Sequence, residues 1–327
     1  MPAPTVRPFH RADRDQLTDL INAHVAAVVP GVSVSVNTVL SSLERQPDEF
    51  ITDPWVAERV TLVAEQRDNL VAAAHLLRYR ADAEVGECYR DIGEIDWLVC
   101  HPPASFWPDP DEAADLLMSA CLAQLARWGV RACCASGELP APVVYGLPRN
   151  WPHIRALYER AGFRHTGDTE VILIARVADL PVREPWPGVT VERTLGECGT
   201  RLTAYADGAP LGFIEVDTTP ARPERHTRAA GLADVGNLHI EPAQYGRGIE
   251  RRLLAQAADW LRLCGADRLL AYGAATDRTM IDHLTSAGFR ELARTDRGWA
   301  LREVPRQVVE RLRSRRGWSR PRGGAAY

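Results

Sequence analysis

The sequence contains no lysine, because all 39 of its Lys and Arg residues are arginine. No side chain of this protein therefore carries a primary amine, and modification at its own lysines is excluded. The seven cysteines are odd in number, are irregularly spaced and form no CxxC pair, so neither a disulfide framework nor a zinc site is indicated. They are Cys88, Cys100, Cys121, Cys133, Cys134, Cys198 and Cys264. We expect reduced thiols that are mostly buried, and no metal.

Long apolar runs are missing as well. No stretch approaches the ~20 residues that a membrane-spanning helix needs, and residues 1–11 are polar rather than signal-like. The formal net charge of −4 gives no reason to expect nucleic acid or a membrane as the main partner. These absences predict a soluble, cytoplasmic protein.

The composition is that of a globular protein, with 46% hydrophobic and 25% charged residues, and 327 residues fit two domains of about 150. A segment with three prolines and a glycine, RVADLPVREPWPGV, lies between two strand-like segments and is typical of a linker. We therefore predict domains at residues 1–179 and 188–303, with a linker at 180–187. The arginine-rich tail at 304–327 has few apolar residues and is expected to be disordered.

The two halves share one order of elements. Each has a hairpin, a strand that ends in proline, a helix, another strand, and a second helix that ends in Ala-Gly-Phe. The strands that end in proline are GEIDWLVCHPP and ADVGNLHIEP, and the Ala-Gly-Phe sequences end at Phe163 and Phe289. Only the first half has room for two helices before its hairpin, in ADRDQLTDLINAHVAAV and NTVLSSLERQPDEF. A generic α/β fold with repeated βαβ units remains the alternative.

The segment NLHIEPAQYGRGIERRLL, residues 237–254, carries the strongest local signal. A short strand ends, a turn with two glycines follows, and an amphipathic helix begins. Gly246 and Gly248 have no Cβ, so that a phosphate can approach the main chain there, and the free N–H groups of a first helical turn form an anion site. The alternative is an ordinary surface turn in front of a solvated helix.

This turn resembles the acyl-CoA pyrophosphate loop of the GNAT superfamily of N-acyltransferases, Q/R-x-x-G-x-G/A. Its central glycine matches, whereas Tyr245 and Glu250 depart from the first and last positions. The order of elements resembles the GNAT fold over about residues 4–178 and 188–303. The resemblance implies an α/β (α+β) protein of two tandem GNAT-like domains, each a mixed, mostly antiparallel central sheet flanked by helices. The first domain is expected to be degenerate, because ASFWPDPDEAAD at the corresponding place is acidic and has no glycine.

The resemblance further implies an acetyl-CoA-dependent N-acetyltransferase whose C-terminal domain binds acetyl-CoA. The acceptor would be a primary amine of a small molecule or peptide. Leu238, His239 and Ile240 would hydrogen-bond the pantetheine arm, and Tyr245, Gly246, Arg247, Gly248, Ile249 and Glu250 would surround the pyrophosphate. A non-catalytic acyl-CoA-binding or regulatory protein and a purely structural module are the alternatives.

Acyl transfer to an amine needs a base for the ammonium proton and an acid for the departing thiolate. Asp234 and Glu94 occupy matching places before the two prolines, and Asp234, next to the glycine turn, is the candidate catalytic base. The alternative for Asp234 is a strand-edge residue that faces solvent. The tyrosine that the family uses as acid corresponds to Tyr158 in the first half but to Leu284 in the second, which leaves Tyr272 or water. Glu215 and Asp217 are further candidates for attracting a cationic amine.

Overall fold

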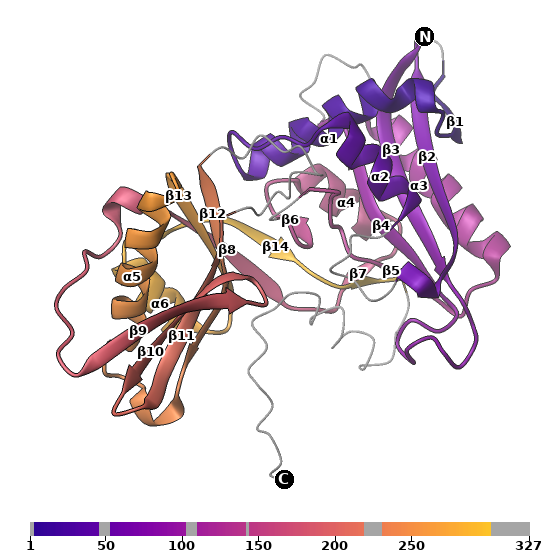
Figure 1. Cartoon of the computed structure of the whole chain (residues 1–327). Coiled ribbons are helices and arrows are strands. Elements are labelled where there is room, and N and C mark those ends of the chain that lie inside the picture. The colour runs from indigo at the N-terminus through magenta and orange to yellow at the C-terminus, as the bar shows by residue number, and fades with distance from the viewer. Residues whose placement is uncertain (1–2, 46–52, 103–109, 142–143, 219–230, 302–327) are drawn as a thin grey trace. The chain divides into compact units, whose positions relative to one another are not determined.

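The computed structural model describes residues 3–45, 53–102, 110–141, 144–218 and 231–301 (Figure 1). The tail predicted at 304–327 lies outside them. The chain forms two compact units, which are described here one at a time. Of the described residues, unit 1 comprises those up to Thr169 together with 294–301, and unit 2 comprises 170–218 and 231–293. Among the described residues, no helix is long and apolar enough to cross a membrane.

Unit 1 contains a seven-stranded sheet in the order β1-β2-β3-β4-β5-β15-β7. The strands are β1 (Thr5–Pro8), β2 (Val56–Gln66), β3 (Asn69–Tyr79), β4 (Ile92–Cys100), β5 (Ala132–Ala135), β7 (Arg164–His165) and β15 (Trp299–Ala300). Only the β4–β5 pair is parallel. A short strand, β6 (Leu147–Pro148), pairs with residues 295–296 of the same unit. The sheet is therefore mixed and mostly antiparallel, as predicted.

Helices α1 (Arg14–Val28), α2 (Val36–Glu44), α3 (Pro110–Trp128) and α4 (Pro152–Arg160) flank this sheet (Figure 1). The two helices expected before the first hairpin are thus present as α1 and α2. The side chain of Ser35 accepts a hydrogen bond from the Thr38 N–H at 3.1 Å and so caps the start of α2. In α3, Leu117, Cys121 and Leu125 recur every four residues and are buried, which explains why this segment forms a helix on the sheet.

Unit 2 contains a second sheet, in the order β14-β8-β13-β12-β11-β10-β9. The strands are β8 (Thr169–Arg176), β9 (Val189–Gly196), β10 (Gly199–Ala206), β11 (Ala209–Asp217), β12 (Leu232–Ile240), β13 (Arg268–Ala274) and β14 (Arg290–Asp296). The helices of this unit are α5 (Ile249–Leu263) and α6 (Arg278–Ser286). The two-residue turn between β9 and β10 leaves no room for counterparts of α1 and α2, as the sequence predicted.

The core of unit 2 lies between the sheet and α5. Ile249, Leu253, Ala257 and Leu261 form the predicted apolar face of this helix and are buried against the sheet. Cys264, three residues after Leu261, lies just beyond the end of α5 and is exposed. From β12, Ala233, Val235, Leu238 and Ile240 join this core. The step from 235 to 238 breaks the alternation of the strand, and a β-bulge at Gly236 causes it.

The last strand of each half of the sequence pairs in the sheet of the other half. The first domain predicted at residues 1–179 contains residues 169–176, whereas β8 pairs antiparallel with β13 along the whole length of β13, in unit 2 (Figure 1). Near the other end of the chain, β15 pairs with β5 and β7 in unit 1. Hydrophobic alternation shows that a segment is a strand and does not show which sheet it joins, so the sequence could not distinguish the two arrangements.

Candidate functional site

The strands β12 and β13 separate in the middle of unit 2. Their parallel pairing covers only Leu232–Asp234 with Arg268–Leu270, although both strands continue. After Asp234 comes the bulge at Gly236, and from there residues 238–240 pair only with β11 on the other side, within the part of the chain that the structure describes. The main-chain groups on the β13 side of Leu238, His239 and Ile240 are thus available to a ligand that lies between the strands.

The glycine turn lies directly after β12. Gly246 and Gly248 have φ angles of +76° and +70°, a left-handed conformation that favours glycine. A Cβ built on either residue would meet no heavy atom within 4 Å, so the space in front of both is open. The N–H groups of Gly248, Ile249, Glu250 and Arg251 donate to no acceptor among the described residues. An open turn with free donors at the start of a 15-residue helix has the chemistry of an anion site.

The side chains around this turn are mixed in charge. Arg247 reaches back to Gln244 Oε1 at 3.3 Å, and Tyr245 is largely exposed. Glu250 is only 9% exposed, and its Oε1 lies 4.0 Å from Nδ1 of His283 on α6. The carboxylate of Glu250 stands in the first turn of the helix, where it counters the positive end of the helix dipole. The donors for an anion in this turn are therefore main-chain N–H groups together with Arg247.

Asp234 lies at the point where β12 and β13 separate. Its residue is 6% exposed, so the alternative of a strand-edge residue facing solvent is wrong. Burial, together with the charge of Asp217, raises the pKa of Asp234 to about 7, and a hydrogen bond with the side chain of Tyr272 acts in the opposite direction. A carboxyl group with a pKa close to neutrality can accept a proton at physiological pH.

The other candidate carboxylates have different surroundings. Glu215 is fully buried and binds Arg201 Nε at 2.6 Å and the N–H groups of Glu197 and Cys198 at 3.2 and 3.3 Å. Glu215 thus fixes the turn between β9 and β10 rather than facing an acceptor. Asp217 is half-buried and pairs directly with Asp234 across β11 and β12.

In unit 1, Glu94 has the same place relative to a bulge as Asp234 has in unit 2, but it is fully buried and accepts a hydrogen bond from the Tyr79 hydroxyl at 2.7 Å. Tyr158 is also fully buried, stacked on Trp299, and burial holds the pKa of its hydroxyl well above the usual value. Leu284 of unit 2 belongs to the apolar core. Residues 104–109 of the acidic segment that replaces the glycine turn in the first half lie outside the described residues.

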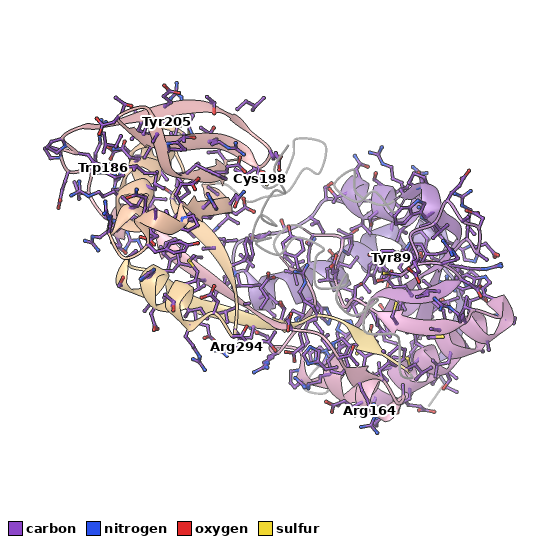
Figure 2. The ribbon with its side chains drawn as sticks, turned by 90° about the horizontal axis from the view of Figure 1, so that it is seen from below. Tyr89, Arg164, Trp186, Cys198, Tyr205 and Arg294 are labelled. Atoms are coloured by element: carbon purple, nitrogen blue, oxygen red, sulfur yellow. The ribbon has the colours of Figure 1, made fainter. Side chains whose placement is uncertain are left out.

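The sequence reading missed the role of Gly236 and Cys198. Cys198 lies in the turn between β9 and β10 (Figure 2), and a Cβ on Gly236 would overlap its side chain. Glycine at the bulge therefore permits a close contact beside Asp234. A lone glycine inside the strand LADVGNLHI was the available signal, because such a glycine marks a bulge or a close approach.

Residues 172–289 match the Acetyltransferase (GNAT) family. No curated protein matches the sequence. A solved tandem GNAT protein from the clavulanic acid biosynthesis pathway is 16% identical, with a TM-score of 0.59 over 91% of this chain and 98% of that one. A GCN5-related N-acetyltransferase from Sphaerobacter thermophilus is 15% identical, with a TM-score of 0.59 over 92% of this chain and 96% of that one.

A third structure, the GCN5-related glucosamine N-acetyltransferase region of a fungal multi-domain GH3 β-N-acetylglucosaminidase, is 15% identical with a TM-score of 0.59. It covers 91% of this chain and 38% of that one. Identities this low show the fold alone, and the fold they show extends over both units. The family match includes β8, the strand that completes the sheet of unit 2, together with β12, the glycine turn and α5. Residues 172–289 thus match the GNAT acetyltransferase family, and the chain has the fold of the tandem GNAT proteins.

Proposed function

We propose that this protein is an acetyl-CoA-dependent N-acetyltransferase whose site lies in unit 2. One observation carries the proposal: the open turn with free N–H groups from Gly248 to Arg251 follows directly on the strand that separates from its neighbour at Asp234. A phosphate group and an extended amide chain are the ligand features that these two elements fit. Acetyl-CoA carries both and supplies the acyl group.

The residues have separate tasks in this proposal. The N–H groups at Gly248, Ile249 and Glu250 bind the pyrophosphate, and Arg247 adds a positive charge. Main-chain groups of Leu238, His239 and Ile240 pair with the pantetheine amides, as a neighbouring strand would. These contacts hold the thioester in the gap between β12 and β13, next to Asp234.

Asp234 acts as the base. It takes a proton from the acceptor ammonium, directly or through water, so that the neutral amine can attack the thioester carbonyl and release the thiolate. Leu284 offers no proton for that thiolate. Tyr272, whose side chain lies close to Asp234, or a water molecule supplies it. A thiolate is a weak base, so this step demands little of the acid.

A non-catalytic acyl-CoA-binding protein is the second candidate. Two observations favour it: the carboxylate of Glu250 stands in the phosphate-binding turn, and Leu284 replaces the tyrosine. Both candidates require cofactor binding, and only the first requires turnover.

Calorimetry with acetyl-CoA, followed by a thiol-release assay, distinguishes them. We expect acetyl-CoA to bind the wild-type protein, and we expect a panel of amines that includes amino sugars, polyamines and peptides to contain one that releases CoA thiol. Replacement Asp234→Ala should stop release and leave binding intact. No binding at millimolar acetyl-CoA would contradict both candidates, and binding without release from any amine would favour the second.

A further inference from the structure

Two aspartates stand side by side at the site. The register of β11 and β12 places Asp217 directly opposite Asp234. Opposite residues of an antiparallel pair point to the same face of the sheet, with Cβ atoms about 4.5–5.5 Å apart. Their neighbours Val216 and Val235 are buried in the core against α5, so the two aspartates point to the other face, the one that carries Arg201 and the turn at Cys198.

The groups that face Asp234 come from three elements. Asp217 faces it from β11, Tyr272 from β13, and Cys198 from the turn between β9 and β10. Glu215, also on β11, is neutralised in place by Arg201. Nearby carboxylates shift the pKa of two groups at this place in the same direction. Asp217 raises the pKa of Asp234. Burial, together with nearby carboxylates that include Asp234 and Asp217, raises the pKa of the Cys198 thiol to about 11.

We propose that Asp217 and Asp234 form a carboxylate pair that binds the ammonium group of the acceptor, with Asp234 accepting its proton and Asp217 positioning the cation. This inference rests on the proposed function. The step balances: the ammonium loses one proton to the Asp234 carboxylate, which becomes a neutral carboxyl, and the amine lone pair is freed for attack.

The pair has consequences for the acceptor. Two close carboxylates favour a cation over a neutral group, since an opposite charge relieves their mutual repulsion. Aliphatic primary amines, which are protonated at neutral pH, are therefore the acceptor class, and aromatic amines, which are neutral there, are poor acceptors. Asp217 acts as a positioning residue, because it sets the charge around the group that reacts.

The test follows the Asp234 carboxyl directly by its ¹³C chemical shift as a function of pH. In the wild-type protein we expect a midpoint near 7. In Asp217→Asn the repulsion is gone, and we expect the midpoint to fall by at least about half a pH unit, with partial recovery in Asp217→Glu. Asp282→Asn, which removes an exposed aspartate of α6, is the matched control and should leave the midpoint unchanged.

Two further readouts separate this inference from the proposed function. Methylammonium should shift the Asp234 resonance in the wild-type protein and not in Asp217→Asn, whether or not the protein transfers an acyl group. If transfer occurs, kcat/KM for an aliphatic amine should fall about tenfold or more in Asp217→Asn, and its acid limb should move to lower pH, while the affinity for acetyl-CoA is unchanged. An Asp234 midpoint that does not depend on Asp217, or a methylammonium effect that survives in Asp217→Asn, would overturn the carboxylate pair. Absence of turnover with both readouts intact would instead count against the proposed function.

Discussion

Asp234 is a residue that lowers the stability of unit 2 at neutral pH. In the unfolded chain its pKa returns to the ordinary value of about 3.9, whereas in the folded unit it is about 7. The folded state therefore binds more protons between these two values, and the free energy of unfolding falls as pH rises through that window. At about 1.4 kcal/mol for each unit of pKa difference, the loss reaches a few kcal/mol above pH 7.

Replacement Asp234→Asn should remove this loss. We expect the variant to be more stable than the wild-type protein at pH 8 by about 1–4 kcal/mol, the gain being reduced by any weakening of the bond with Tyr272. Near pH 4 the two proteins should be equally stable. Urea denaturation at the two pH values, followed by a signal from unit 2, measures the difference. A variant that is less stable at pH 8 would show that the carboxylate serves the fold and would weaken its assignment as a base.

Single residues were the least predictable level of the site. The sequence identified Asp234 by its distance from Pro242 but could not show that it is buried or that Asp217 lies opposite it, because both depend on strand register. It offered Glu215 and Asp217 as equal candidates, and only the folded structure shows that Glu215 holds Arg201 and the turn whereas Asp217 lies opposite Asp234.

At the scale of elements, the turn from Gly246 to Gly248 combines two demands on glycine. The backbone requires it because φ is positive, and the proposed ligand requires it because a Cβ would occupy the open space in front of the turn. The other end of the same helix has a glycine that the backbone requires but the proposed ligand does not. Gly265, just beyond the end of α5, has φ of +73° and also has no heavy atom within 4 Å of a built Cβ.

Gly248→Ala and Gly265→Ala therefore form a matched pair. Both should lower stability by about 1–2 kcal/mol, the usual strain of an L-residue in this conformation. Only Gly248→Ala should weaken acetyl-CoA binding, by roughly tenfold or more, which corresponds to at least about 1.4 kcal/mol. Thermal denaturation and calorimetry measure the two effects. Equal affinity in both variants would move the phosphate site away from this turn.

Most elements could be predicted because their signals are local. The apolar face of α5 recurs at helical spacing and the hairpin turns carry polar residues or glycine, so their type and order follow from neighbours in sequence. The bulge at Gly236 was not predicted, although it shifts the face of every later residue in β12. At Gly236 the strand lies against Cys198, which is 38 positions earlier in the sequence and comes close to β12 only in the folded sheet.

On the scale of the whole molecule, the sequence could not predict that β8 joins the sheet of unit 2 and β15 the sheet of unit 1, because both strands fit either sheet by composition. The consequence is that a half of the chain, cut at the predicted linker, is incomplete. The segment 188–303 lacks β8, which lies between β13 and β14 in the sheet of unit 2. The loss would be in the middle of the sheet, next to the buried residues Leu269, Leu270 and Ala271 of β13.

A fragment of residues 188–301 should therefore fail to fold, whereas a fragment of residues 168–301 keeps β8 between β13 and β14. Without β8, β13 and β14 become exposed sheet edges whose N–H and C=O groups are unpaired. Such edges favour pairing with other chains and aggregation. We expect the shorter fragment to elute as aggregate in size-exclusion chromatography and to bind no acetyl-CoA, and the longer one to elute as a compact species with strand-rich circular dichroism. Adding a synthetic peptide of residues 168–178 during refolding should rescue the shorter fragment in part. If the 188–301 fragment were compact and bound acetyl-CoA, unit 2 would fold without β8. The prediction that its sheet needs β8 would then be wrong.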